Sequence, residues 1–484
     1  MSSLKSMSSL KFGTSGLRGL VTDLEGGPSF AYAAAFLAAI GTEAGARREV
    51  VVGRDLRDSS AGIAATVAAA AAAAGVTAID CGALPTPALA LEARRRGACA
   101  VMVTGSHIPE DRNGLKFYRP GGDEITKADE AAILAALGAA GDAPPPPAVP
   151  AAPEPDAIAR YRRRSLDAFG PDLLAGRTVA VYQQSSVARD LLADVLASCG
   201  ARAVPIGRSD TFVPIDTEAH RPQDVAFIRD VMASGRFDAL VTTDGDADRP
   251  LVADADGRIL RGDVLGLITA RYLGADAVVV PVTAGSAIER TGFPRVLRTR
   301  VGSPFVIAGM EQARREGATV VCGFEANGGF LLGSDVAIGG RILPALPTRD
   351  AMLPILATLA AAQAQGLSLA DLVAALDAGQ TASDRLGDVA AERSGALLGR
   401  LRDAAFRRDF LRPVGSPQAV DEQDGVRIVL DGERTIHFRA SGNAPELRCY
   451  AEAKSEREAE DLVRWGLAAA AAAMDGTAGP GGAA

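Results

Sequence analysis

The chain has 484 residues, a length that predicts about three or four domains rather than one hydrophobic core. Its composition, 48% hydrophobic and 23% charged, is that of a globular protein. The formal net charge of −8 argues against a nucleic acid or an anionic membrane as the main partner. The net charge does not exclude a small anionic substrate, because the binding of such a substrate depends on local arginine clusters.

Cysteine usage and the first residues indicate a reducing compartment. The five cysteines stand at 81, 99, 199, 322 and 449 and form no CxxC or zinc pattern. Residues 1–7 are polar and carry no secretory signal, and we expect them to be disordered. The alanine runs 61–74 and 468–473 are too short and too weakly apolar to span a bilayer. We therefore expect a soluble, cytoplasmic protein with no membrane partner.

The first 150 residues alternate strand-like and helix-like segments. Three elements are predicted there: a strand at 50–53, a helix at 61–74 and a strand at 98–104. This is the pattern of βαβ units around a largely parallel sheet. Ahead of them, Phe12-Gly-Thr-Ser-Gly-Leu-Arg-Gly19 combines glycines with Arg18, which suits the binding of an anion. The proline-rich stretch 141–150 predicts a semi-rigid linker and a domain boundary.

Ser106 follows the strand at 98–104, within Thr104-Gly-Ser-His-Ile-Pro109. The carboxyl end of a strand is where α/β sheets place ligands. A serine hydroxyl needs a base or a cation to act as a nucleophile, and His107 is adjacent, but the G-x-S-x-G pattern of a triad is absent. Ser106 is thus a candidate to carry a phosphoryl group, with a plain turn serine as the alternative.

Lys116 stands ten residues after Ser106, close enough along the chain to return to the same pocket. A lysine there would transfer a proton or hold a phosphate, and a solvated lysine is the alternative. The segment Gly53–Ser60 resembles the start of a helix, and its charges are interpreted as helix caps.

The second α/β unit, 151–261, ends in an acidic loop. Its predicted elements are a strand at 177–182, a helix at 190–199 and a buried strand at 237–243. Asp244, Asp246 and Asp248 follow that strand at alternate positions, so we expect the three carboxylates to be able to converge on one point. Oxygen ligands with open positions suit Mg²⁺. An EF-hand is excluded by Arg249 and Ala255 at positions that need Gly and Glu; a solvated acidic turn is the alternative. Asp254–Gly257 is expected to be a hairpin turn.

The rest of the chain predicts a third α/β unit at 262–383 and a different, smaller unit at 384–475. In the third unit, strands at 276–281 and 318–322 are expected, the latter leading into Gly323-Phe-Glu-Ala-Asn-Gly-Gly329. In the smaller unit we predict a hairpin of 426–430 and 435–439, a strand at 447–451 and a helix at 455–474 capped by Ser455. The tail 476–484 is expected to be disordered.

Arg439-Ala-Ser-Gly-Asn-Ala-Pro445 forms a tight loop between two predicted strands. It offers a guanidinium, a hydroxyl, an amide and backbone N–H groups, which are the parts of a phosphate site. As an isolated hairpin turn the sequence is ordinary, so the five motifs carry the argument together.

Taken together, these motifs resemble the α-D-phosphohexomutase superfamily, most closely its phosphomannomutase/phosphoglucomutase branch, from Phe12 to about Met474. The resemblance implies an α/β fold of three related α/β domains with mixed, largely parallel sheets, plus a smaller C-terminal α+β domain, around a central cleft. The domains would then be 1–150 with the phosphoserine loop, 151–261 with the metal loop, 262–383 with the sugar loop and 384–475 with the phosphate loop.

The resemblance also implies a role for each matching residue. Ser106 matches the phosphorylated serine and His107 its neighbour, with Ile108 in place of the usual Asn. The metal loop D-G-D-x-D-R is matched throughout, and the phosphoserine supplies a further ligand oxygen. The sugar loop keeps Glu325 but has Asn327 for Ser and Gly329 where His is frequent. The residues implied to bind substrate are Glu325, Asn327, Arg439, Ser441, Gly442, Asn443 and Arg448.

The implied reaction is the interconversion of hexose 6-phosphate and hexose 1-phosphate, most closely of mannose phosphates. PhosphoSer106, held by Mg²⁺, would form a hexose 1,6-bisphosphate intermediate, which also serves as activator. Mg²⁺, Arg18 and Arg249 would offset charge on the transferring group, and Lys116 and His107 are candidates for proton transfer. The chain is expected to be a monomer or homodimer. The alternatives are a phosphoglucomutase, a phosphoglucosamine mutase, a phosphatase using the same serine and metal, or a silent sugar-phosphate binding protein.

Overall fold

The computed structural model describes residues 9–13, 16–41, 48–139, 151–441 and 445–476. The linker predicted at 141–150 lies outside these residues, as do residues 1–7 and nearly all of the tail predicted at 476–484. The chain divides into two compact units. The first comprises 1–279 and 302–372, and the second comprises 280–301 and 373–484. In the described part of the chain, no helix combines the length and the apolar character needed to cross a membrane.

The first sheet of the first unit has seven strands in the order β1-β2-β6-β5-β3-β4-β7. Strands β3, β4, β5 and β7 run parallel, whereas β6, β2 and β1 add an antiparallel edge. Helix α2 packs on α3 and α5, and the alanines of α3 are small enough to bring it close to the sheet. The strands are β1 (Lys11–Phe12), β2 (Leu17–Leu20), β3 (Glu49–Arg54), β4 (Thr77–Ala83), β5 (Cys99–Val103), β6 (Arg112–Tyr118) and β7 (Ala152–Pro153). The helices are α1 (Val21–Leu24), α2 (Gly27–Ala39), α3 (Ser60–Ala73), α4 (Thr86–Arg96) and α5 (Lys127–Ala139).

The second sheet has the order β11-β10-β8-β9, in which β9, β8 and β10 are parallel and β11 is antiparallel. Every residue of β10 and β11 is buried, as the apolar sequence of this segment predicts. The strands are β8 (Thr178–Gln184), β9 (Arg202–Arg208), β10 (Ala239–Thr243) and β11 (Pro250–Ala253). The helices are α6 (Ala157–Phe169), α7 (Arg189–Ser198) and α8 (Pro222–Met232).

In the third sheet, β14 lies between parallel β12 and antiparallel β15, and β18 follows β15. Strands β16 and β17 form a separate hairpin. The strands are β12 (Ala277–Pro281), β14 (Val321–Phe324), β15 (Phe330–Leu332), β16 (Val336–Ile338), β17 (Arg341–Leu343) and β18 (Leu346–Asp350). The helices are α9 (Gly262–Tyr272), α11 (Ser303–Arg315), α12 (Met352–Gln365) and α13 (Leu369–Ala374).

The three sheets repeat one arrangement. In each, a buried strand that has a parallel neighbour on one side pairs on the other side with an antiparallel strand that follows it in sequence: β5 with β6, β10 with β11, and β14 with β15. The loops between these strands contain Ser106, the three aspartates and Glu325 respectively. The three loops that bear the chemistry thus occupy equivalent topological positions, as expected for three related α/β domains.

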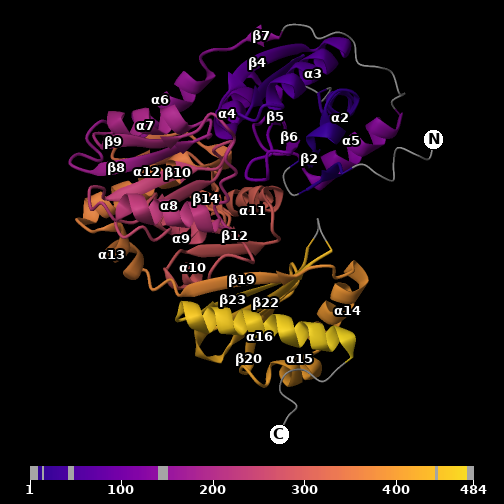
Figure 1. Ribbon diagram of the computed structural model, residues 1–484, viewed down its shortest axis with the longest axis vertical. Coiled ribbons are helices and arrows are strands. Elements are labelled where there is room, and N and C mark those ends of the chain that lie inside the picture. Colours follow the sequence, from indigo (N-terminus) through magenta and orange to yellow (C-terminus); the bar gives the residue numbers. More distant parts are fainter. Residues whose placement is uncertain (1–8, 14–15, 42–47, 140–150, 442–444, 477–484) are drawn as a thin grey trace. The chain divides into compact units, whose positions relative to one another are not determined.

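The second unit is built on an antiparallel sheet with the order β19-β23-β22-β21-β20. The long helix α16 lies along this sheet (Figure 1) and packs on β19, β22 and β23. The strands of this sheet are β19 (Gln380–Leu386), β20 (Pro417–Asp421), β21 (Val426–Leu430), β22 (Thr435–Ala440) and β23 (Leu447–Ala453), whereas β13 (Arg295–Thr299) belongs to the second unit but not to this sheet. The helices are α10 (Ala287–Arg290), α14 (Ala391–Arg402), α15 (Ala404–Leu411) and α16 (Glu456–Asp475).

Most predicted elements are confirmed within a few residues, and the class is mixed α/β as expected. Ser455 caps α16, because its hydroxyl accepts a hydrogen bond from the N–H of Glu458 at 3.3 Å. Asp254–Gly257 is a turn, closed by the bridge between Ala253 and Ile259. The strand expected at 318–322 begins later, at Val321, because Asp276 accepts hydrogen bonds from the N–H groups of Thr319 and Val320.

Helix α9 approaches β14 closely enough that only glycine fits at the contact. A Cβ on Gly266 would stand 2.3 Å from ring carbons of Phe324, the residue before Glu325. We expect Gly266→Ala to lower the free energy of unfolding by about 1–3 kcal/mol through overpacking, although alanine favours helix. Gly62, an exposed glycine of α3 with open space around it, is the matched control. Gly62→Ala should raise stability by about 1 kcal/mol. The free energies of unfolding of both variants can be measured in urea, and equal changes in the two would contradict the close contact at Gly266.

Candidate active site

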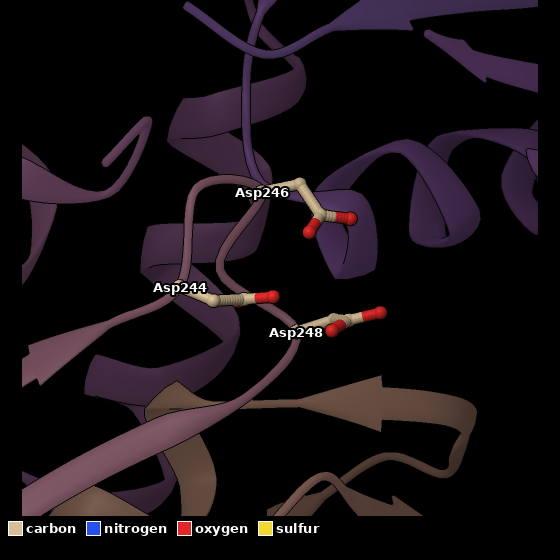
Figure 2. A group of neighbouring side chains, drawn as sticks. All are labelled: Asp244, Asp246 and Asp248. Atoms are coloured by element: carbon tan, nitrogen blue, oxygen red, sulfur yellow. The ribbon is translucent and has the colours of Figure 1, made fainter. Parts of the chain in front are cut away.

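Asp244, Asp246 and Asp248 lie on the buried loop that joins β10 to β11. Figure 2 shows their carboxyl groups directed to the same side of the loop. One carboxylate oxygen from each lies within 4.8 Å of the others, and all three residues are buried. The loop is a tight turn in which Ala247 adopts a positive φ of 58° and the N–H of Asp244 donates to the carbonyl of Arg249. The three carboxylates converge as expected, but a tight turn, rather than alternation along an extended strand, brings them together.

Ser106 joins this acidic cluster from the loop after β5. Its hydroxyl donates to Asp244 Oδ2 at 2.6 Å and lies 3.2 Å from Nδ1 of His107. Ser106 is fully buried and has a positive φ of 55°, a conformation unusual for a residue with a Cβ. Outliers of this kind gather at functional sites, where the surrounding contacts maintain them. The structure thus unites two predicted motifs that stand 138 residues apart.

Lys116 reaches the same cluster from β6. Its Nζ donates to Asp246 Oδ2 and to Asp248 Oδ2, both at 2.6 Å, and the side chain is buried. Burial alone would lower the pKa of this ammonium, but Asp246 and Asp248 outweigh it and the pKa is raised. Lys116 is therefore an ion-paired cation inside the site rather than a solvated lysine.

The pKa values of the carboxylates differ with their surroundings. Burial raises the pKa of Asp244 well above its ordinary value, and repulsion from Asp246 and Asp248 raises it further. Burial would also raise the pKa of Asp248, but Arg349, Lys116 and Arg249 hold it well below the usual range. The cluster therefore combines an unstable charge at Asp244 with a well-neutralised charge at Asp248.

The acidic cluster fits a hard divalent cation. Asp246 Oδ1 and Asp248 Oδ1 are buried and accept no hydrogen bond from the described residues; the neighbour of Asp248 Oδ1 is Arg249 Nε, at 3.7 Å. Buried carboxylate oxygens without donors are costly unless a cation binds them. Oxygen donors from three aspartates, with Ser106 beside Asp244, are the ligand type that Mg²⁺ prefers.

Arg18 and Arg249 add positive charge near Ser106. Arg18 lies on β2, and its Nε and Nη2 are buried without a hydrogen-bond partner among the described residues. Burial and the nearby Arg249 lower the pKa of Arg18 to about 10, so it remains charged at neutral pH. Burial, together with Arg249 and Arg18, also lowers the pKa of His107 well below its ordinary value. These contacts leave a neutral imidazole beside two guanidinium groups.

Glu325 and Asn327 occupy the loop between β14 and β15. Glu325 Oε2 accepts hydrogen bonds from Ser303 at 3.2 Å and from Arg349 at 3.1 Å. Asn327 Oδ1 accepts from the N–H of Gly329 at 2.9 Å, so this amide oxygen stabilises the loop itself. The glutamate is therefore part of the buried charge network, whereas half of the asparagine amide is already engaged.

Asp55 and Arg57, interpreted from the sequence as helix-cap charges, support the Ser106 loop instead. The Arg57 guanidinium donates to the carbonyls of Ser106, Ile108, Pro109 and Arg112 over 2.6–3.1 Å. The Asp55 carboxylate accepts a hydrogen bond from Arg57 Nε. It also accepts hydrogen bonds from the hydroxyls of Ser60 and Thr104 and from the N–H of Gly105. The sequence could have indicated this role, because Asp55 and Arg57 follow buried β3 directly and so lie at the same edge of the sheet as Ser106.

Arg349 and Thr86 also belong to this network and were not singled out from the sequence. Thr86 Oγ1 donates to Asp246 Oδ2 at 2.5 Å, and Arg349 Nη2 donates to Asp248 Oδ2 at 2.8 Å. Neither lies in a recognisable motif, because each acts from another part of the fold.

The predicted phosphate-binding residues lie in the second unit. Arg439, near the end of β22, forms an ion pair with Asp424 at 2.9 Å. It stands directly opposite Arg448 on β23, and Arg448 stands opposite Arg385 on β19. Like charges in such cross-strand positions repel, and Glu446 offsets them here by pairing with Arg448 at 3.3 Å and with Arg385 at 3.4 Å. The N–H of Ser441 donates to the carbonyl of Glu446. Gly442 and Asn443 lie outside the described residues.

Three stretches of the chain match one protein family, phosphoglucomutase/phosphomannomutase. Residues 9–142 match its alpha/beta/alpha domain I, residues 261–378 its alpha/beta/alpha domain III, and residues 383–464 its C-terminal domain. These matches cover the loops that hold Ser106, Glu325 and Arg439.

Individual proteins give the same result over nearly the full length. A phosphomannomutase of Sinorhizobium fredii is 46% identical over 465 residues, 95% of this chain and 98% of the relative. A phosphoglucosamine mutase of Desulforudis audaxviator is 30% identical over 475 residues, 94% of this chain and 97% of the relative. The solved structure of a phosphoglucomutase/phosphomannomutase family protein from Burkholderia thailandensis superposes with a TM-score of 0.74 at 21% identity, covering 97% of this chain and 98% of that one.

The carbonyl contacts of Arg57 lead to a prediction about the Ser106 loop. Arg57→Met leaves Asp55 buried without its cation, so unfolding free energy should fall by about 3–5 kcal/mol. Arg57→Lys keeps the charge but not the fork, and amide hydrogen exchange across 105–112 should accelerate in it. Arg112→Met, which removes the exposed side chain at the start of β6, where this loop ends, should change stability by less than about 0.5 kcal/mol. Unchanged exchange in Arg57→Lys would contradict the supporting role.

Proposed function

Since the chain belongs to the phosphoglucomutase/phosphomannomutase family, we propose that it interconverts hexose 6-phosphate and hexose 1-phosphate, with mannose phosphates as preferred substrates. The observation that carries this proposal is the contact of Ser106 Oγ with Asp244 Oδ2 at 2.6 Å, inside the cluster of three carboxylates. This contact supports the proposal, because the hydroxyl proposed to carry the phosphoryl group lies against the carboxylates proposed to bind a cation.

In the proposed reaction, Ser106 carries a phosphoryl group and the sugar hydroxyl attacks its phosphorus. The bond from phosphorus to Ser106 Oγ breaks as the bond to the sugar oxygen forms, which gives a hexose 1,6-bisphosphate. The bisphosphate then reorients in the site, and its other phosphoryl group is transferred back to Ser106. The same bisphosphate would act as activator by phosphorylating unmodified Ser106.

Asp244, Asp246, Asp248 and Ser106 would hold Mg²⁺, which when bound would offset charge on the transferring phosphoryl group. Arg18 contributes in the same direction, because its buried Nε and Nη2 have no hydrogen-bond partner among the described residues. Arg249 is positioned beside the acidic cluster, since its Nε lies 3.7 Å from Asp248 Oδ1. Together these cations favour a transition state that accumulates negative charge.

His107 and Lys116 are the candidates for moving the proton of the attacking hydroxyl. His107 Nδ1 lies 3.2 Å from Ser106 Oγ, within reach of the reacting oxygens. Lys116 Nζ contacts Asp246 and Asp248, so it could exchange a proton with these carboxylates. The geometry supports either residue.

Substrate-binding roles are proposed for residues of each unit by itself. Glu325 and Asn327 would bind sugar hydroxyls, and Arg439, Ser441, Gly442, Asn443 and Arg448 would bind the phosphate that does not react. Arg385 joins this second group by its position opposite Arg448. The identity of 46% to a phosphomannomutase, against 30% to a phosphoglucosamine mutase, supports mannose as the sugar. The proposal includes a cytoplasmic location, consistent with buried free cysteines.

The role of Ser106 predicts a separation of binding from turnover. Ser106→Ala should lower kcat by on the order of 10³-fold or more, because the phosphoryl carrier is lost. Calorimetry should still detect mannose 1-phosphate binding, since the binding residues are intact. Ser234→Ala, a change at an exposed serine of the same unit, is the control and should keep wild-type kcat. Retained turnover in Ser106→Ala would refute the role.

The substrate assignment is tested by measuring kcat/KM for mannose, glucose and glucosamine 1-phosphates side by side, with Mg²⁺ and the bisphosphate. We expect mannose 1-phosphate to be preferred by about tenfold or more, the scale of one well-placed hydroxyl contact. Comparable rates with glucose would replace this assignment by dual specificity. Release of free phosphate without an isomer would indicate a phosphatase, and no reaction would indicate a binding protein.

A further inference from the structure

Arg349 connects two loops that the proposed function uses separately. From the end of β18, its Nη2 and Nε donate to Asp248 Oδ2 at 2.8 and 3.1 Å. Its Nη1 donates to Glu325 Oε2 at 3.1 Å and to Ser303 Oγ at 2.5 Å. One guanidinium therefore bridges the metal loop and the sugar loop.

The bridge is buried and surrounded by negative charge. Arg349 is 2% exposed, and Glu124 Oε1 lies 3.0 Å from its Nη2 as a third carboxylate partner. Burial would lower the pKa of Arg349, but Asp248, Glu124 and Glu325 outweigh it and raise it. Removing this cation would leave three carboxylates facing one another, which is more costly than losing a surface ion pair.

Gly329 makes room for the arginine. A Cβ on Gly329 would lie 2.5 Å from Cδ and 2.8 Å from Cγ of Arg349, so the arginine stem occupies the space of a side chain at 329. Gly329 directly precedes β15, and Arg349 lies on β18, the strand that pairs with β15. Any larger residue at 329 would displace the stem and with it the guanidinium.

We propose that Arg349 is a positioning residue that fixes Glu325 of the sugar loop relative to Asp248 of the metal loop, and that Gly329 is required to admit it. The inference rests on the proposed function, in which Glu325 binds sugar hydroxyls and Asp248 binds the cation. Substrate and cation affinity are then coupled through one side chain that touches neither. The planar fork is essential, because a single ammonium does not span both carboxylates in the same geometry.

The test combines a double-mutant cycle with metal binding. Arg349→Met keeps the stem against Gly329 but removes the fork, so KM for mannose 1-phosphate should rise about tenfold, the scale of coupling between contacting residues. The same variant should bind Mn²⁺ about tenfold more weakly by calorimetry, because Asp248 loses its partner. In a Glu325→Gln background, Arg349→Met should raise KM less than about threefold, because the residue it positions is already altered.

Milder variants and a control guard against loss of folding. Arg349→Lys should recover thermal stability more than it recovers KM, and Gly329→Ala should shift KM in the same direction as Arg349→Met. Arg164, a buried arginine that pairs with Asp350 at 3.2 Å, is the matched control. Arg164→Met should lower the melting temperature while KM and Mn²⁺ affinity per folded molecule stay at wild-type values.

Two results would overturn the inference: additive effects of Arg349→Met and Glu325→Gln on KM, or wild-type KM and Mn²⁺ affinity in folded Arg349→Met. Failure of the proposed function is distinguishable, because it would appear as absent mutase activity in the wild-type protein. Mn²⁺ affinity of Arg349→Met would then still decide whether Arg349 positions Asp248.

Discussion

Asp244, Asp246 and Asp248 repel one another at the buried end of β10, and the arrangement around them offsets that repulsion. Lys116 reaches the cluster from the first sheet, and Arg349 reaches it from the third. Each cation is itself buried and would be unstable without the aspartates. The acidic loop of the second sheet is therefore neutralised only when its two neighbouring sheets are folded and in place.

The repeated topology explains how distant loops meet. In all three sheets the functional loop follows a buried strand and precedes an antiparallel neighbour, so each loop leaves its sheet at the same kind of edge. Within the first unit, hydrogen bonds then tie Ser106 to Asp244 and Asp248 to the network around Glu325. A common construction has been given different chemistry in each copy: a hydroxyl, a carboxylate cluster and a glutamate.

The sequence predicts this site where the chemistry is contiguous and misses it where the partner is remote. Asp244 and Ser106 stand in short motifs after apolar strands, so their residue types and spacing suffice. Arg57 binds carbonyls that lie 49 to 55 residues away, Arg349 binds Asp248 from 101 residues away, and nothing local marks either arginine. Asn327 shows a different limit, because its amide oxygen binds the loop backbone, a choice set by the turn. The strands and helices could be predicted for a simpler reason, because their patterns of apolar residues are visible in the local sequence.

The backbone of Ser106 carries a cost that bears on the evolution of this fold. A positive φ of 55° is strained by on the order of 1–3 kcal/mol for a residue with a Cβ, and glycine would adopt it freely. Replacing this serine by glycine would thus relax the loop while removing the hydroxyl. Relief of backbone strain alone would favour glycine at this position, so the Ser106 hydroxyl is present at the expense of folding free energy.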